Sequence, residues 1–182
     1  MAAHQIIIAG FGGQGVLFLG EVLARAALHE GREVTWLPAY GPEQRGGTAH
    51  CTVVIDDEPI ASPVVADPTV LIVMNRPSLD RFEAQVQPGG VIVCDTTVTG
   101  RLPARRDVTV IGVPATAIAT HLGVPRAANI VLLGALLEVR PPCGLDAIRA
   151  ALDEMVRDPQ ARAGNLEALE RGRREASVSS AR

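Results

Sequence analysis

A glycine-rich turn near the start of the chain is the first feature that could do chemistry. Gly10-Phe11-Gly12-Gly13-Gln14-Gly15 fits the pattern Gly-x-Gly-x-x-Gly. It follows an apolar stretch, Gln5–Ala9, and precedes a stretch with helical spacing of apolar residues, Val16–His29. Glycines let the backbone turn sharply and approach a ligand closely. The start of the helix offers free N–H groups to an anion, so this context predicts a site for a phosphate-bearing ligand.

One part of the dinucleotide-binding pattern is missing from the sequence. In that pattern an acidic residue ends the second strand and holds the ribose hydroxyls. Here the second expected strand ends at Leu37, and Glu33 lies at its start. Three interpretations of the turn therefore stay open: a phosphate-bearing ligand other than NAD, NAD itself, or a tight strand–helix turn that binds nothing.

A second unusual stretch is Tyr40-Gly41-Pro42-Glu43-Gln44-Arg45-Gly46-Gly47-Thr48. Because it follows the second strand, it is expected at the same edge of the sheet as the glycine turn, where doubly wound proteins bind ligands. Arg45 could form a forked pair of hydrogen bonds with a phosphate or a carboxylate. Glu43 could act as a base or bind an amine. The alternative is a surface turn closed by a Glu43–Arg45 ion pair.

The composition excludes several kinds of chemistry. All 17 basic residues are arginine, so the chain has no lysine. This excludes Schiff-base enzymes, phosphate-loop NTPases and kinases, which need a lysine. The net charge of −3 argues against nucleic-acid binding. The three cysteines lie far apart and show no metal or cluster spacing. We expect no metal site, with Cys51 and Cys94 in the core and Cys143 exposed.

The apolar pattern predicts strands that alternate with helices along the chain. The expected strands are Gln5–Ala9, Glu33–Leu37, Thr48–Ile55, Val70–Met74, Val91–Cys94 and Val108–Val113. The expected helices are Val16–His29, Pro77–Gln85, Ala115–His121, Asn129–Val139, Leu145–Val156 and a surface helix, Asn165–Glu175. Asp56-Asp57-Glu58 is expected to be a hairpin turn with Pro59–Ala61 as the returning arm. This order predicts a doubly wound α/β sheet that the hairpin makes mixed.

We expect one domain over residues 1–158, followed by a polar helix and tail over residues 159–182 whose end is disordered. No apolar run reaches the length of a membrane span, roughly 18 residues. The first residues do not show the pattern of a signal peptide. We therefore expect a cytoplasmic protein that does not enter a membrane.

The two glycine-rich stretches together resemble the gamma subunit of 2-oxoacid:ferredoxin oxidoreductases. Further motifs in the same order extend the resemblance over roughly residues 5–155: Pro59-Ile60-Ala61-Ser62-Pro63, Met74-Asn75-Arg76-Pro77-Ser78-Leu79, Pro88-Gly89-Gly90 and Asn129-Ile130-Val131-Leu132-Leu133-Gly134. The Gly-Pro-Glu and Asn-Arg-Pro-Ser motifs look most like those of the 2-oxoglutarate or branched-chain (2-ketoisovalerate) enzymes.

The resemblance implies a Rossmann-like three-layer α/β/α fold with a mostly parallel, mixed sheet. It also implies a subunit, inactive alone, of an enzyme that oxidatively decarboxylates a 2-oxoacid, with 2-oxoglutarate expected, to an acyl-coenzyme A. Electrons pass to ferredoxin. Thiamine diphosphate and iron–sulfur clusters would lie on partner chains, which are alpha and beta subunits and in some enzymes a ferredoxin-like delta subunit. The chain alone would bind no cofactor, and when isolated it could self-associate through surfaces that partners cover.

By the same resemblance, both glycine-rich stretches contribute to the coenzyme A side of the active site. The implied residues are Gly12, Gly13, Gln14, Gly15, Glu43, Arg45, Gly46, Gly47, Asn75 and Asn129. Coenzyme A suits them because its phosphates need backbone N–H groups and guanidinium forks. Asn75 and Asn129 could instead be helix-cap or turn residues. No catalytic residue is assigned. An NAD(P)-binding oxidoreductase and a ligand-free interaction module stay as alternative functions.

Overall fold

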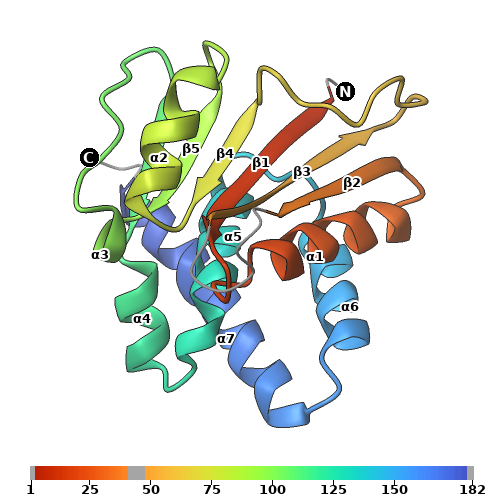
Figure 1. Ribbon diagram of the computed structural model, residues 1–182. Helices are drawn as coiled ribbons and strands as arrows, with labels where there is room; N and C mark the ends of the chain where they lie inside the picture. Colours follow the sequence, from red (N-terminus) through yellow and green to blue (C-terminus); the bar gives the residue numbers. More distant parts are fainter. Residues whose placement is uncertain (1–2, 41–47, 180–182) are drawn as a thin grey trace.

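The computed structural model describes residues 3–40 and 48–179, which form a six-stranded sheet with helices on both faces (Figure 1). The strands are β1 (His4–Phe11), β2 (Glu33–Tyr40), β3 (Thr48–Asp56), β4 (Val70–Val73), β5 (Val91–Asp95) and β6 (Thr109–Val113). The helices are α1 (Val16–His29), α2 (Arg76–Phe82), α3 (Thr96–Thr99), α4 (Ala115–His121), α5 (Ala128–Val139), α6 (Leu145–Met155) and α7 (Pro159–Ser179). Short 3-10 turns follow α2 and precede α5. The Rossmann-like three-layer α/β/α fold is thus confirmed.

The strand order is β2-β3-β1-β4-β5-β6. Strands β1, β4, β5 and β6 are parallel neighbours, whereas β3 runs antiparallel to both β1 and β2. All residues of β4 and β5 are buried, as expected of parallel strands that are covered on both faces. The sheet is therefore mostly parallel and mixed, as predicted, but β3 makes it mixed by lying between β1 and β2.

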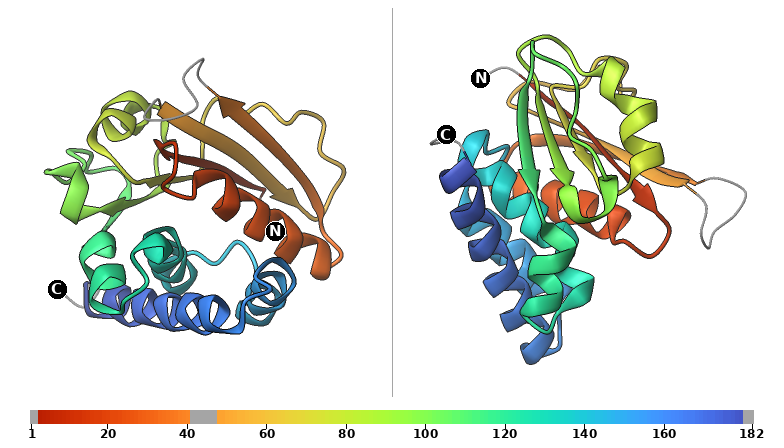
Figure 2. Two further views of the ribbon diagram at one scale, coloured as in Figure 1. Left: turned by 60° about the horizontal axis from the view of Figure 1, so that its bottom comes forward. Right: turned by 90° about the vertical axis from the view of Figure 1, so that its left-hand side faces the viewer.

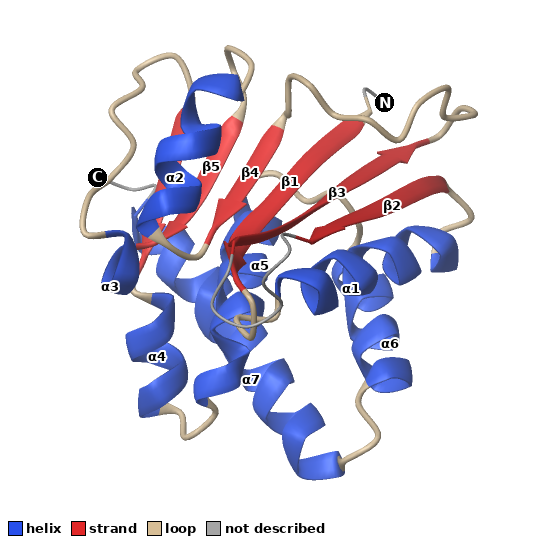
Figure 3. Cartoon of the chain, in the orientation of Figure 1, coloured by secondary structure: helices blue, strands red, loops and turns tan. Residues whose placement is uncertain are grey.

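The predicted hairpin after β3 is wrong. Residues 57–69, including the expected returning arm Pro59–Ala61, form no strand and are drawn as a loop in Figure 3. Three prolines in this segment lack the N–H group that a strand ladder needs. The segment instead crosses one face of the sheet, where the Thr52 hydroxyl donates to the Pro63 carbonyl at 3.2 Å and Val65 is buried.

The two faces of the sheet carry separate hydrophobic cores. Ile6 and Ile8 of β1 pack on the side of α1, α5, α6 and α7. Ile7 and Ala9 point to the opposite side, where α2 and the segment 57–69 cover the sheet. The right-hand view of Figure 2 shows α2 on one side of the sheet and α5 and α7 on the other. Within the described ranges, no helix combines the length and apolarity that crossing a bilayer requires.

The C-terminal helix α7 belongs to the larger core, although the sequence predicted a surface helix. Its side chains Ala168, Leu169 and Ala176 are fully buried, and the helix lies against α5 (Figure 2). Two glycines allow this approach. A Cβ atom on Gly134 of α5 would collide with the Leu169 carbonyl, and one on Gly172 of α7 would collide with the Val131 carbonyl. The division of the chain after residue 158 stays a prediction.

The close approach of α5 and α7 leads to a test of stability. Gly172→Val should lower the free energy of unfolding by about 3 kcal/mol, because the added side chain forces the helices apart. Urea denaturation followed by circular dichroism measures this change. The matched control is Glu167→Ala at an exposed position of the same helix, where we expect a change of about 0.5 kcal/mol or less. Equal effects of the two substitutions would contradict the packing described here.

Candidate functional site

The glycine turn connects β1 to α1 at the carboxyl edge of the parallel strands (Figure 1). Gly13 has a φ of 97°, and Gly15, which precedes the first helical residue, has a φ of 78°. Side chains are strained in this left-handed region, so both positions favour glycine. Apart from Gly13 and its two chain neighbours, no atom of the described residues lies within 4 Å of the point where a Cβ of Gly13 would be. The described residues therefore leave open space beside Gly13.

The backbone of this turn has free hydrogen-bond donors. The Gln14 N–H donates to the Phe11 carbonyl at 3.1 Å and closes the turn. The N–H groups of Gly12, Gly13 and Gly15 donate to no acceptor in residues 3–40 or 48–179. They lie at the amino end of α1, a helix of 14 residues. Free donors and the positive end of the helix dipole are the features that bind an anion.

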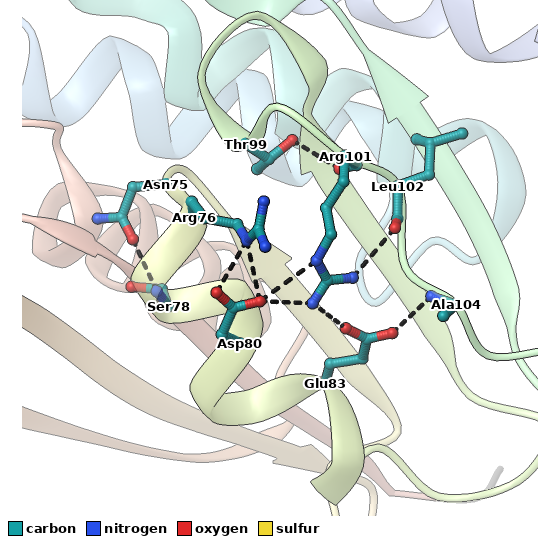
Figure 4. Close-up of polar contacts among 9 residues, drawn as sticks. All are labelled: Asn75, Arg76, Ser78, Asp80, Glu83, Thr99, Arg101, Leu102 and Ala104. Atoms are coloured by element: carbon teal, nitrogen blue, oxygen red, sulfur yellow. Dashed lines mark hydrogen bonds and ion pairs between the residues drawn. The ribbon is translucent and has the colours of Figure 1, made fainter.

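The side chain of Gln14 points toward the sheet. Its Oε1 accepts the Phe11 N–H at 2.6 Å, and its Nε2 donates to the Met74 carbonyl at 2.8 Å. Asn75 is buried beside it, with Nδ2 at 3.5 Å from the Gln14 Oε1. The Asn75 Oδ1 accepts the Ser78 N–H at 2.8 Å and so caps α2, as Figure 4 shows.

Asn129 supports the turn from the opposite side. It is buried in the first turn of α5, and its Nδ2 donates to the Gly15 carbonyl at 3.0 Å. Its Oδ1 accepts the N–H of Ile130 at 2.9 Å. The structure thus brings Gly12–Gly15, Asn75 and Asn129 together, but the amide groups of Gln14, Asn75 and Asn129 are engaged with the protein itself.

The other predicted site residues, Glu43, Arg45, Gly46 and Gly47, lie outside the described residues. The strand that leads to these residues, β2, is longer than predicted and continues past Leu37 to Tyr40.

The sheet topology explains why the acidic ribose clamp is missing. In a dinucleotide-binding sheet, the strand beside β1 runs parallel to it and carries the acid at its carboxyl end. Here the neighbour of β1 on the β2 side is the antiparallel β3, which begins at this edge, with Thr48 opposite Phe11. The carboxyl end of β2 lies one strand further away. The order of the strands, like the residue at the end of β2, therefore argues against the dinucleotide interpretation.

One buried acid at the same edge was not predicted from the sequence. Asp95 ends β5 and is almost fully buried. Its carboxylate accepts the N–H groups of Thr97 and Thr116, each at 3.0 Å, and the Thr116 hydroxyl at 2.5 Å. It therefore joins the start of α3 to the start of α4. An acid at the end of an apolar strand, followed by two threonines, is the sequence signal that could have revealed this helix cap.

A network of charged side chains fixes the loop after α3 onto α2 (Figure 4). The Arg101 guanidinium bonds to Asp80 and to Glu83, each at 2.6 Å. Glu83 also accepts the Ala104 N–H at 2.6 Å, and Arg76 pairs with Asp80 at 2.8 Å. Hydrogen bonds from Arg101 and Arg76 lower the pKa of the Asp80 carboxyl. The network uses both acids to hold the chain, which suits a structural role.

All three cysteines are buried. Cys51 and Cys94 lie in the core as predicted, but Cys143, predicted to be exposed, is also buried, and its thiol lies 3.9 Å from the Leu23 carbonyl. Burial raises the pKa of each thiol to about 12. Among the described residues, no three or more His, Cys, Asp or Glu side chains gather in a way that could hold a metal ion.

Comparisons with known proteins identify the family. Residues 5–175 match the family model described as pyruvate ferredoxin/flavodoxin oxidoreductase. Because the match covers most of the chain, the protein belongs to this family.

The ketoisovalerate oxidoreductase subunit VorA of Methanothermobacter marburgensis is 50% identical over 73% of this chain but only 28% of its own length. The 2-oxoglutarate synthase subunit KorC of Methanocaldococcus jannaschii is 36% identical over 84% of this chain and 83% of its own length. The chain thus spans little more than a quarter of the first relative and most of the second.

Two solved structures share the fold. The gamma subunit of a keto/oxoacid ferredoxin oxidoreductase from Geobacter sulfurreducens PCA has a TM-score of 0.87 and 25% identity, with 98% of both chains covered. The 2-oxoglutarate:ferredoxin oxidoreductase of Magnetococcus marinus has a TM-score of 0.88 and 24% identity. The match with this second structure covers 98% of the present chain and 32% of the solved chain. At this identity it shows a shared fold alone.

The burial of the cysteines predicts their reactivity. At pH 7.5 the native protein should show almost no reaction with a thiol reagent such as dithionitrobenzoate, because the thiols are buried and protonated. In guanidinium chloride all three should react. The released thionitrobenzoate anion is read by its absorbance. Rapid labelling of one thiol in the native state, with Cys143→Ser abolishing it, would show that Cys143 is exposed after all.

Proposed function

We propose that this chain is the gamma-type subunit of a 2-oxoacid:ferredoxin oxidoreductase and forms part of its coenzyme A site. In the proposed reaction a 2-oxoacid is oxidatively decarboxylated to an acyl-coenzyme A, and the electrons pass to ferredoxin. The observation that carries this proposal is the glycine turn, whose three free N–H groups lie at the amino end of α1. Membership in the family supports the proposed class of reaction. The glycine turn supports the proposed role of this chain, which is to bind coenzyme A.

Coenzyme A fits the geometry of the turn. Its pyrophosphate and 3′-phosphate need N–H donors and arginine, and it needs no acidic ribose clamp, which the position of β3 precludes here. The Magnetococcus marinus enzyme that shares this fold was solved with coenzyme A bound. We assign the phosphate contacts to Gly12, Gly13 and Gly15, with Arg45 as the charged partner. Glu43, Gly46 and Gly47 stay predicted members of the site.

We propose 2-oxoglutarate as the oxoacid. The relatives carry two substrate names, ketoisovalerate for VorA and 2-oxoglutarate for KorC. The KorC relative matches this chain over most of both lengths, which supports the second substrate for a separate subunit of this size. In this proposal the groups that recognise the oxoacid side chain lie on the partner chains.

The proposed partners are the alpha and beta subunits, with a ferredoxin-like delta subunit in some assemblies and ferredoxin as electron acceptor. Thiamine diphosphate and the iron–sulfur clusters are assigned to those chains, because the cysteines here are buried singly in the core. Exposed apolar side chains support a covering partner: Leu37 on β2 is 44% exposed, and Val64 in the segment 57–69 is 69% exposed. Self-association of the isolated chain through these residues, and a cytoplasmic location, stay predictions.

The proposed role of Arg45 gives a kinetic test. In the assembled enzyme, Arg45→Ala should raise the KM for coenzyme A by about tenfold, the cost of one charge-assisted hydrogen bond to phosphate. The KM for the oxoacid should change little. Steady-state assays with a ferredoxin-type acceptor and a panel of 2-oxoacids measure both constants and identify the substrate.

Arg106→Ala is the matched control, because Arg106 is exposed and its side chain has no partner among the described residues. This control should behave like the wild type. Unchanged coenzyme A kinetics in Arg45→Ala would remove Arg45 from the site, and a stabilising shift in Tm with NADH but not with coenzyme A would favour the dinucleotide alternative.

A further inference from the structure

The carboxyl ends of β1 and β4 separate at the edge that carries the glycine turn. The last pair in their ladder is Ala9 and Val73, and the Met74 N–H still donates to the Ala9 carbonyl at 2.9 Å. Beyond this point β1 leads to α1 on one face of the sheet, whereas β4 leads to α2 on the other (Figures 1 and 2). Such a switch point leaves a crevice where doubly wound proteins place their ligands.

The side chain of Gln14 fills the crevice between these strands. Its amide bridges the ends of the two diverging strands. The Oε1 accepts the Phe11 N–H at 2.6 Å, and the Nε2 donates to the Met74 carbonyl at 2.8 Å. The packing is so close that a Cβ atom on Gly10 would lie only 2.7 Å from the Gln14 Oε1 and 3.1 Å from the Met74 Cβ. The amide thus continues the hydrogen bonding between β1 and β4 beyond the last ladder pair.

We infer that Gln14 is a positioning residue for the anion site and does not itself contact the ligand. This inference rests on the proposed function. Both polar atoms of its amide are engaged with the backbone of the protein, so Gln14 acts through the turn. Its amide occupies the gap between the two strands, while the N–H groups of Gly12 and Gly13 have no acceptor among the described residues.

Asn129 completes this support from the side of α5. Its Nδ2 donates to the Gly15 carbonyl, which also accepts the Leu19 N–H inside α1. The turn is therefore tied to β4 by Gln14 and to α5 by Asn129. Donors that are fixed before the ligand arrives bind it without a further cost of ordering. Loosening either tie should weaken the binding of the anion while the chemistry at the partner chains continues.

Gln14→Met tests the inference in the assembled enzyme, since methionine keeps the volume and removes both hydrogen bonds. We expect the KM for coenzyme A to rise by roughly tenfold, the scale of a lost hydrogen-bonded support. The kcat and the KM for the oxoacid should stay within about twofold of the wild-type values. Asn129→Ala removes the hydrogen bond that ties the turn to α5 and should show the same pattern. If Gln14→Met fails to fold, this second variant still tests the inference.

Thr69→Val is the matched control, because Thr69 bridges the same two strands at the opposite edge of the sheet. Its Oγ1 accepts the Gln5 N–H at 3.0 Å and donates to the Gln5 carbonyl at 3.1 Å. It is buried, as a purely structural side chain would be. This variant should lower the Tm by an amount similar to that of Gln14→Met and leave the KM for coenzyme A unchanged.

The outcomes separate the inference from the proposed function. A lowered Tm with an unchanged KM for coenzyme A in Gln14→Met and Asn129→Ala would overturn the positioning role. If Gly13→Val, which places a side chain among the free donors, still raises that KM, the proposed function stands without the inference. Unchanged coenzyme A kinetics in Gly13→Val and Arg45→Ala would instead reject the proposed function itself.

Discussion

The separation of β1 and β4 at their carboxyl ends is the constraint on which the site depends. Their following helices cover opposite faces of the sheet, so the ladder cannot continue past Met74. Gln14 fills the resulting gap, and Gly10 has no side chain because the amide lies against its backbone. Gln14 and Asn129 thereby hold the turn at the start of α1, where the N–H groups of Gly12, Gly13 and Gly15 have no acceptor among the described residues. In the proposed anion site, a local turn is held in place by contacts from distant parts of the chain.

The position of β3 bears on which ligand suits the proposed site. An antiparallel strand between β1 and β2 removes the place where a dinucleotide fold carries its acidic ribose clamp. A ligand held mainly through phosphates, such as the proposed coenzyme A, is compatible with this arrangement. With its cysteines buried one by one, the chain offers binding groups and leaves redox chemistry to partners in the proposed assembly.

The sequence predicted those elements that local patterns define. The bounds of α1 and α4 agree with the expected helices, and all six strands lie close to the expected ranges. These elements could be predicted because apolar periodicity and flanking glycines or prolines can be read from residues that are close in the sequence. The sequence did not predict the pairing of β3 with two strands, the path of residues 57–69 or the burial of α7, because each depends on contacts across the fold. The glycine turn was found from its motif, but the direction of the Gln14 side chain depends on Met74, 60 residues further along the chain.

Amide hydrogen exchange of the assembled enzyme, with and without coenzyme A, tests the central claim most directly. If the turn binds the phosphates, coenzyme A should slow the exchange of the Gly12, Gly13 and Gly15 amides, which have no acceptor among the described residues. Amides of β6, at the far edge of the sheet, should exchange at the same rate in both states. Unchanged exchange in the turn at a saturating concentration of coenzyme A would contradict the account.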